Sequence, residues 1–283
     1  MSIIEGALER SKRSREERSR EAAPDAAAGA SVVVSRKVVA APERPAPVRL
    51  QFEQLPIDRR VCENERVLLS DDRNHQYSAL LDSYRILRTR IWHRGVESER
   101  WSSLGIVSAG PGEGKTVTCI NLALAFAREK RRNVFLLDLD LRNASICRYI
   151  GVTPRTEIGS AITGAAKPEQ VFFGIGVENL FVAGGLTSYE NSSEMLGGHG
   201  VADLLAYVNN VDPHALILVD LPPLLISADA QVVAPRLSAV ALVVAEGMTR
   251  RDQLDRATEL LAGVQVAGIV LNRSREAVED YYS

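Results

Sequence analysis

The sequence predicts a three-layer α/β fold built around a mostly parallel β-sheet. From about residue 78 onward, short apolar stretches typical of strands alternate with longer stretches whose apolar residues have helical spacing. Two strand candidates, LILVD and AVALVV, are almost continuously apolar, which is typical of parallel strands covered by helices on both faces. Sheets of this kind bind their ligands at the carboxyl ends of the strands.

The expected elements follow from this alternation in chain order. A helix over 78–94 carries apolar residues at helical spacing, namely Leu80, Leu81, Tyr84, Leu87 and Ile91. Further helices are expected over 115–130, 199–209 and 251–262. Strands are expected over 104–108, 134–138, 180–183, 215–220, 239–244 and 266–271.

Composition divides the chain into three parts. Residues 1–20 are mostly charged with a few apolar residues on one side, so they either dock on a partner or an acidic membrane surface, or form a frayed, solvated end. Residues 21–48 are rich in alanine, proline and valine, which is typical of a linker. We therefore expect a largely disordered arm and linker over 1–77, a folded domain over 78–275 and a flexible tail over 276–283.

Bulk composition excludes several classes of protein. The 283 residues, 46% hydrophobic, can bury one core of about 200 residues. A net charge of −2 gives no reason to expect nucleic-acid binding. The 3 cysteines are too few and scattered for a disulfide framework or a zinc site, and no apolar run approaches the ~18 residues of a membrane span. These features indicate a cytoplasmic protein.

Residues 109–116 read AGPGEGKT and predict a phosphate-binding loop. The loop lies between an apolar strand and a helix, which is the context that this motif requires. Its glycines let the backbone N–H groups surround an anion at the start of the helix. We expect the loop and the first helical turn to bind ATP, through Gly110, Pro111, Gly112, Glu113, Gly114, Lys115, Thr116 and Val117.

Acidic residues follow two of the predicted strands at their carboxyl ends. Asp138 and Asp140 lie in DLDLR after one strand, and Asp220 ends another. Carboxylates beside a phosphate loop predict a Mg²⁺ site, because hard cations prefer oxygen ligands. Asp138 and Asp140 can face the same crevice only if the chain turns at Leu139. Each acid taken alone could instead cap a helix or lie in a solvated turn.

Together these motifs resemble those of the bacterial tyrosine kinases, which have a phosphate-loop fold. The resemblance covers about residues 78–283 and rests on AGPGEGKT with NLALAFA, on LLDLDLR and on LVDLPPLLISADA. It extends to NLFVAGG, SSEML, VVAEGMT and GIVLNR. The opening MSIIEGALER is similar to the start of tyrosine autokinases associated with exosortase-linked exopolysaccharide clusters. Alanine stands at position 109, where glycine is usual in a phosphate loop; its small size is tolerated there, and the departure points towards a subfamily.

The resemblance implies a role for each site residue. Lys115 would bind the β- and γ-phosphates, while Thr116, Asp140 and Asp220 would hold Mg²⁺. Asp138 would accept the proton of the incoming tyrosine hydroxyl, a poor nucleophile at neutral pH. Arg142 would stabilise a neighbouring acid or phosphate. Asn272 and Arg273 match the position at which this superfamily contacts adenine.

Two further features fit an autokinase that assembles into a ring. Asp82, Arg85 and Arg88 share one helix face and resemble the E-x-x-R-x-x-R motif that joins subunits in this family, although the same spacing also occurs in solvated charged stripes. Tyr281 and Tyr282 stand near the acidic end of the chain and are the expected phosphoacceptors, fewer than family members usually carry. Phosphates there would add repulsion between subunits.

We therefore expect a Mg²⁺- and ATP-dependent tyrosine autokinase that phosphorylates its tail in trans and regulates exopolysaccharide or capsule synthesis or export. The resemblance implies a transmembrane polysaccharide co-polymerase or chain-length regulator as activator, a cognate tyrosine phosphatase, and attachment to the inner membrane through the activator. One alternative is an ATPase switch of the MinD/ParA type, which typically has a lysine where this chain has Gly110. A non-catalytic ATP-binding regulator of a membrane partner is the other.

Overall fold

The computed structural model describes residues 47–69, 78–98 and 100–274. The described residues form an eight-stranded sheet in the order β1-β4-β5-β3-β6-β2-β7-β8. β2, β3, β5, β6, β7 and β8 run parallel, while β4 pairs antiparallel with β5 and β1 pairs parallel with β4. The strands are β1 (Glu53–Gln54), β2 (Ser103–Ser108), β3 (Val134–Asp138), β4 (Phe173–Gly174), β5 (Leu180–Ala183), β6 (Leu216–Asp220), β7 (Ala239–Ala245) and β8 (Val266–Asn272).

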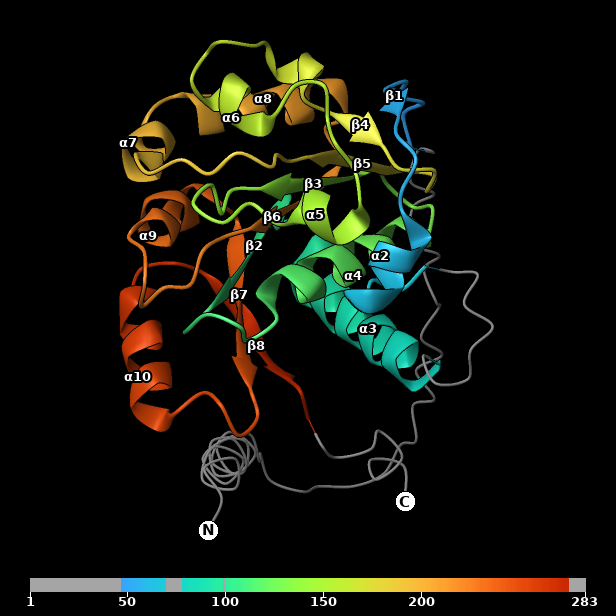
Figure 1. Ribbon diagram of the computed structural model, residues 1–283. Coiled ribbons are helices and arrows are strands. Elements are labelled where there is room, and N and C mark those ends of the chain that lie inside the picture. The colour runs from blue at the N-terminus through green and yellow to red at the C-terminus, as the bar shows by residue number, and fades with distance from the viewer. Residues whose placement is uncertain (1–46, 70–77, 99, 275–283) are drawn as a thin grey trace, which may run out of the picture. The chain divides into compact units, whose positions relative to one another are not determined.

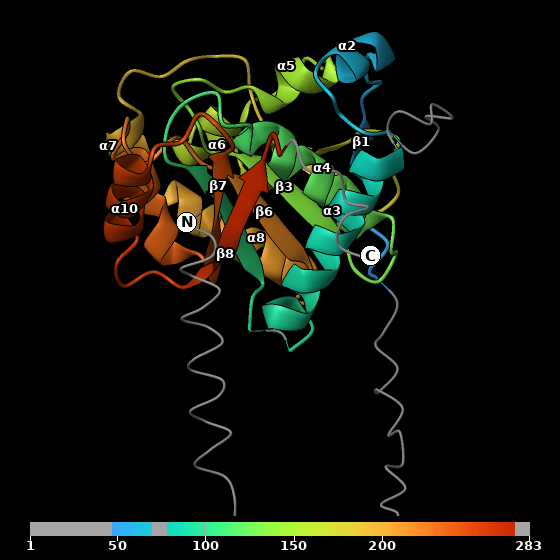
Figure 2. The same cartoon turned by 90° about the horizontal axis from the view of Figure 1, so that it is seen from below.

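Helices cover both faces of the sheet. Figure 1 shows α3 and α4 on one side and α6 to α10 on the other, and Figure 2 shows the same division from below, with β8 at the edge. The helices are α2 (Arg59–Asn64), α3 (Ser78–Ile91), α4 (Lys115–Ala127), α5 (Ile146–Ile150), α6 (Ile158–Ile162), α7 (Ser192–Gly197), α8 (Gly200–Val211), α9 (Asp229–Val233) and α10 (Arg251–Leu260). A π-helical turn (Trp92–Val96) extends α3, and two 3₁₀ turns cover Pro168–Gln170 and Ala234–Arg236.

The core consists of two apolar layers, one on each face of the sheet. Successive strand residues point to opposite faces, so Leu136 packs with the α4 side while Phe135 and Leu137 pack with the α8 side. β2, β3, β6 and β7 are buried along their whole length. The predicted three-layer fold, with a parallel sheet covered on both faces, is therefore confirmed.

The folded domain begins earlier than the expected position 78. Phe52 joins an aromatic cluster with Phe135, Phe172 and Phe181, and Cys62 on α2 is fully buried. The Asn133 amide donates to the carbonyl of residue 48 at 2.9 Å, which anchors the start of this segment. Residues 47–69 were expected to belong to the arm and linker over 1–77. Instead they contribute Cys62, Val67 and Leu69 to the core on the α4 side of the sheet.

The six expected strands and the helices near 78, 115, 199 and 251 are all present, with ends shifted by a few residues. β1, β4 and the short helices α2, α5, α6, α7 and α9 were not predicted. Each has two to six residues, too few for a periodic pattern to emerge. Among the described helices, none combines the length and the apolar character needed to cross a bilayer.

Candidate nucleotide-binding site

The phosphate loop connects β2 to α4 at the carboxyl edge of the sheet. Gly112 and Gly114 have φ values of 73° and 90°, in the left-handed region that favours glycine. A Cβ atom at Gly114 would lie 2.1 Å from Nδ2 of Asn272, so only glycine fits there. The loop thereby delivers the chain to the first turn of α4, whose free N–H groups and helix dipole attract anions.

Lys115 and Thr116 meet two carboxylates at the first turn of α4. The Lys115 Nζ atom lies 2.7 Å from Asp140 Oδ2 and 3.3 Å from Asp220 Oδ1. The Thr116 hydroxyl donates to Asp220 Oδ2 at 2.6 Å. Burial alone would lower the pKa of Lys115, but the charges of Asp220 and Asp140 outweigh it and raise that pKa. Lys115 therefore carries its positive charge at every physiological pH.

Asp138 lies beside this cluster and is fully buried. Its Oδ2 accepts the N–H groups of Ser145 and Ile146 at 2.8 and 2.9 Å, and thus caps the start of α5. Its Oδ1 accepts the Asp140 N–H at 3.3 Å, which produces the turn expected at Leu139. Burial and the Asp220 carboxylate raise the pKa of Asp138 to about 7. The helix-capping alternative considered for these acids thus applies to Asp138.

Glu113 and Gly110, both expected to contact the nucleotide, instead bind each other. The Gly110 N–H donates to Glu113 Oε2 at 3.1 Å, and the Thr249 hydroxyl donates to Oε1 at 2.6 Å. Glu113 is buried, and neither it nor Gly110 lines the cavity. A carboxylate inside the loop satisfies one of its inward N–H groups and ties the loop to residue 249, which the motif alone does not reveal.

Asn272 and Arg273 reach the loop from the end of β8. The Asn272 amide donates to the Glu113 carbonyl at 2.8 Å, and Arg273 Nη2 donates to the Gly112 carbonyl at 2.7 Å. Arg273 has a left-handed φ of 56°. Both side chains line the cavity, where a base could lie against them.

A cavity of about 970 Å³ extends from the loop across the carboxyl ends of the strands. The expected site residues that line it are Pro111, Gly112, Gly114, Lys115, Thr116, Val117, Asp140, Arg142, Asn272 and Arg273. Asp138 and Asp220 lie just beneath its wall and are fully buried.

The far wall of the cavity was not predicted. The end of α2 and the turn after it contribute Asn64, Glu65 and Arg66. α3 contributes Leu80 and Tyr84, and Tyr149 and Ile226 complete this wall. The Asn121 amide on α4 holds this segment, since it donates to the Arg66 carbonyl at 2.9 Å and accepts the Leu68 N–H at 2.8 Å. Only the paired prolines after Asp220 gave a sequence signal for this side of the site.

The residues present fit Mg²⁺ and a nucleotide triphosphate. A hydroxyl and two carboxylates supply the hard oxygen ligands that Mg²⁺ prefers, and phosphate and water oxygens complete such a shell. In the part of the chain that the structure describes, no group of three or more His, Cys, Asp or Glu residues could hold a metal by itself.

The three residues expected to join subunits do not share one environment. Asp82 and Arg85 are exposed and pair with each other at 2.7 Å. Arg88 turns inward instead, and its Nη2 lies 2.9 Å from Glu129 Oε1. This pairing was not predicted from the sequence, because Glu129 follows the end of α4 and is distant from Arg88 in the chain. Tyr281 and Tyr282 lie outside the described residues.

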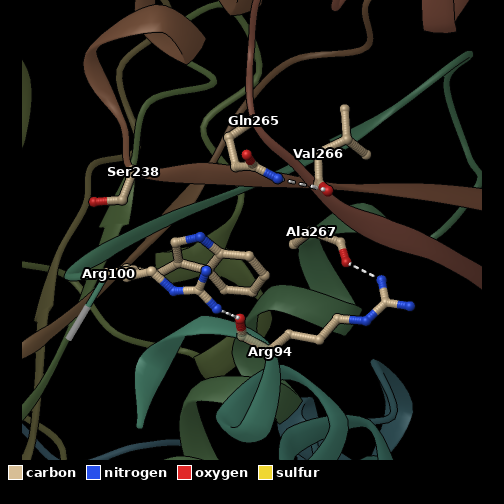
Figure 3. A pocket seen from close by; sticks show the side chains of 7 residues that line it. Arg94, Arg100, Ser238, Gln265, Val266 and Ala267 are labelled. Atoms are coloured by element: carbon tan, nitrogen blue, oxygen red, sulfur yellow. Dashed lines mark hydrogen bonds between the residues drawn. The ribbon is translucent and has the colours of Figure 1, made fainter. Parts of the chain in front are cut away.

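A second cavity, of about 410 Å³, opens at the opposite edge of the sheet (Figure 3). Ser238 and Gln265 lie at its rim, just before β7 and β8. Its arginines are occupied by the backbone, because Arg94 donates to the Ala267 carbonyl and Arg100 donates to the Arg94 carbonyl at 2.8 Å. This cavity has no contact with the phosphate loop.

Comparisons with known proteins agree with this geometry. The family model of the CobQ/CobB/MinD/ParA nucleotide-binding domain matches residues 104–281. The chain is 29% identical over 203 residues to the tyrosine-protein kinase YwqD of Bacillus subtilis, covering 71% of this chain and 84% of that protein. It is 29% identical over 201 residues to the tyrosine-protein kinase CpsD of Streptococcus pneumoniae serotype 4, covering 70% and 86%. The structure of the kinase domain of Escherichia coli tyrosine kinase ETK matches with a TM-score of 0.64 at 24% identity, covering 80% of this chain and 92% of that one.

Proposed function

Because the chain belongs to the CobQ/CobB/MinD/ParA nucleotide-binding domain family, and within it to the bacterial tyrosine kinases, we propose that it is an ATP-dependent protein-tyrosine autokinase. Its product would be a phosphorylated tail, at Tyr281 and Tyr282, formed in trans between subunits. The observation that carries this proposal is the meeting of Lys115 and Thr116 with Asp140 and Asp220 at the mouth of the phosphate loop.

We infer a task in phosphoryl transfer for each of these residues. Lys115 would bind the β- and γ-phosphate oxygens, and Thr116, Asp140 and Asp220 would hold Mg²⁺, either directly or through water. Mg²⁺ held by these residues would supply positive charge beside the phosphate oxygens. Most of the acceleration comes from this positioning and electrostatic stabilisation, as in other phosphoryl transfers.

Asp138 accepts the proton of the tyrosine hydroxyl in this proposal. Two backbone N–H groups occupy its Oδ2, whereas Oδ1 has a single long contact of 3.3 Å, so Oδ1 is the oxygen that takes the proton. A pKa of about 7 suits a base that works at neutral pH. Asp138 is fully buried, so its carboxylate must become accessible before the acceptor can reach it.

The biological setting rests on the relatives rather than on the geometry. We propose that the kinase regulates exopolysaccharide or capsule synthesis or export, works at the inner membrane through a transmembrane polysaccharide co-polymerase that activates it, and is reversed by a cognate tyrosine phosphatase. Subunits would assemble as a ring through α3, with Asp82 and Arg85 available for that contact.

Phosphotyrosine mapping by mass spectrometry tests the proposal. The full chain is incubated with ATP and Mg²⁺, with and without a peptide of the cytoplasmic end of the membrane partner. We expect phosphate on Tyr281 or Tyr282, and its loss in Lys115→Met. A wild-type chain that carries no phosphotyrosine under either condition contradicts the kinase, and ATP hydrolysis without phosphotyrosine would favour the MinD/ParA-type switch.

A further inference from the structure

A fully buried carboxylate, Asp229, lies at the start of α9 and has no role in the mechanism above. Ser192 donates its hydroxyl to Asp229 Oδ2 at 2.6 Å, Ser193 donates to Oδ1, and the Asp229 N–H donates to Ser227 Oγ at 3.1 Å. Burial by itself would raise the pKa of Asp229, but the hydrogen bonds from the serines and the charge of Arg142 lower it. A buried charge is costly unless it is paired, so a carboxylate held in this way requires a partner cation.

That cation is Arg142, which lies two residues after Asp140. Its Nε donates to Ser192 Oγ at 2.9 Å and lies 3.6 Å from Asp229 Oδ2. Its carbonyl accepts the Ser188 hydroxyl at 2.6 Å, which fixes the backbone at the same place. Arg142 is thus held from α7 and α9, two helices that pack against each other on the far side of the sheet from α4 (Figure 1).

The anchoring uses only one side of the guanidinium. In the described residues, neither Nη group of Arg142 has a hydrogen-bond or ion-pair partner, and the side chain is 50% exposed where it lines the main cavity. Arginine recognises phosphate best through two parallel N–H groups, and a guanidinium fixed at Nε has such a pair left.

Arg142 lines the same cavity as Lys115, the lysine expected to bind the β- and γ-phosphates. Arg142 follows Asp140, whose carboxylate contacts Lys115 Nζ at 2.7 Å. Asn272 and Arg273 contact the loop at Gly112 and Glu113 instead. Arg142 and Lys115 thus line the same cavity next to Asp140, whereas Asn272 and Arg273 approach the loop from the end of β8.

We propose that Ser192 and Asp229 are positioning residues that aim the Arg142 guanidinium at the terminal phosphate of the nucleotide. The inference rests on the proposed ATP site but does not need the acceptor to be tyrosine. Without the anchor, a half-exposed arginine samples many rotamers and loses that freedom only on binding, which weakens the contact. The anchor removes this cost before the nucleotide arrives.

A double-mutant cycle on nucleotide affinity tests the proposal. The readout is the ratio of Mg-ATP to Mg-ADP affinity, measured by isothermal titration calorimetry on the full chain, because only ATP has the terminal phosphate. We expect Arg142→Ala to lower this ratio about tenfold, as for loss of a charged hydrogen bond. Ser192→Ala should lower it about threefold, and Arg142→Ala/Ser192→Ala should match Arg142→Ala alone, because Ser192 acts through Arg142.

Two further variants separate positioning from stability. Ser192→Thr keeps the hydroxyl and should restore the ratio. Asp212→Asn is the matched control, since Asp212 is also a buried carboxylate but lies at the opposite end of β6, where it accepts from Asn133 at 2.8 Å. It should lower the melting temperature and leave the ratio unchanged. Asp229→Asn should lower both the melting temperature and the affinity ratio. If Asp229→Asn does not fold, Ser192→Ala and Ser192→Thr still test the positioning role.

Additive effects of Arg142→Ala and Ser192→Ala would overturn the proposal, as would an unchanged ratio in Arg142→Ala or failure of Ser192→Thr to restore it. Phosphotyrosine is scored in parallel. A wild type without phosphotyrosine, whose affinity ratio still follows the expected cycle, contradicts the tyrosine kinase and leaves the positioning role standing.

Discussion

At the scale of single residues, Asp138 is subject to opposing influences. Burial and the neighbouring Asp220 raise its pKa to about 7, while the N–H groups of Ser145 and Ile146 stabilise its charged form. An aspartate in the unfolded chain loses its proton near pH 4. Between these values the folded state binds more protons, so the free energy of unfolding falls as pH rises, by up to about 1.4 kcal/mol per pH unit.

Asp138→Asn tests this assignment, because asparagine does not titrate. In the absence of nucleotide, urea denaturation at pH 5 and pH 8 should show a smaller loss of stability in the variant than in the wild type. Part of the loss remains, since burial also raises the pKa of Asp220. An identical difference between the two pH values in both proteins would contradict the raised pKa of Asp138.

Glu113 supplies a second prediction at this scale. Glu113→Ala leaves the Gly110 N–H and the Thr249 hydroxyl without their acceptor, and should cost about 1–3 kcal/mol of unfolding free energy. It should also weaken Mg-ATP binding, because the loop loses an internal constraint. Glu113→Gln keeps an acceptor for Gly110 and serves as the control. Equal binding by the alanine variant and the wild type would show that the loop holds its shape without Glu113.

At the scale of elements, residues 47–69 form the least expected part of the domain. Two buried asparagines hold this segment: Asn121 at residues 66 and 68, beside the cavity, and Asn133 at residue 48, at the other edge of the sheet. Asn121→Ala and Asn133→Ala should each cost about 1–3 kcal/mol in urea denaturation, because buried polar groups lose their partners. Only Asn121→Ala should also weaken Mg-ATP binding, since residues 64–66 line the cavity.

Equal effects of the two asparagine variants on nucleotide affinity would mean that this segment contributes to stability alone. Asn133 also binds Asp212, so its substitution affects more than the contact with residue 48. The comparison therefore depends on affinity and not on the size of the stability loss.

The sequence predicted the elements whose pattern is repeated over many residues. The buried strands and α4 follow from continuous or periodic apolar residues, and the phosphate loop follows from its glycines. Three other features join residues that are distant in the chain. They are the cavity wall at residues 64–66, the hydrogen bond between Thr249 and Glu113, and the pairing of Arg142 with Asp229. Such contacts leave no local pattern, because each depends on where the fold brings a single side chain.

At the scale of the whole molecule, α3 carries both an internal and an external contact. Arg88 and Glu129 are largely buried against each other, whereas Asp82 and Arg85 are exposed. We expect Arg88→Ala to lower the melting temperature. Arg85→Ala and Asp82→Ala should leave the melting temperature nearly unchanged, since exposed ion pairs contribute about 0–1 kcal/mol.

If α3 joins subunits, Arg85→Ala and Asp82→Ala should reduce the fraction of oligomer measured by analytical ultracentrifugation. Unchanged assembly in both would exclude the Asp82–Arg85 face from the interface.

The contacts of Lys115 with Asp140 and Asp220 have a consequence for the order in which charges enter the site. The positive charge of Lys115 balances the negative charges of Asp140 and Asp220. If a phosphate bound Lys115 in their place, the two carboxylates would lie unpaired beside another negative group, and the repulsion would weaken binding. A divalent cation held by Asp140 and Asp220 would take the place of the lysine beside these acids and would keep the local charge nearly balanced. In calorimetric titrations the protein should therefore bind ATP far more weakly when EDTA removes Mg²⁺. Asp220→Asn removes one of the two negative charges, so it should reduce the difference between the ATP affinities measured with and without Mg²⁺. We therefore predict that this salt bridge favours binding of the metal complex of ATP over binding of free ATP, because one cation would be exchanged for another.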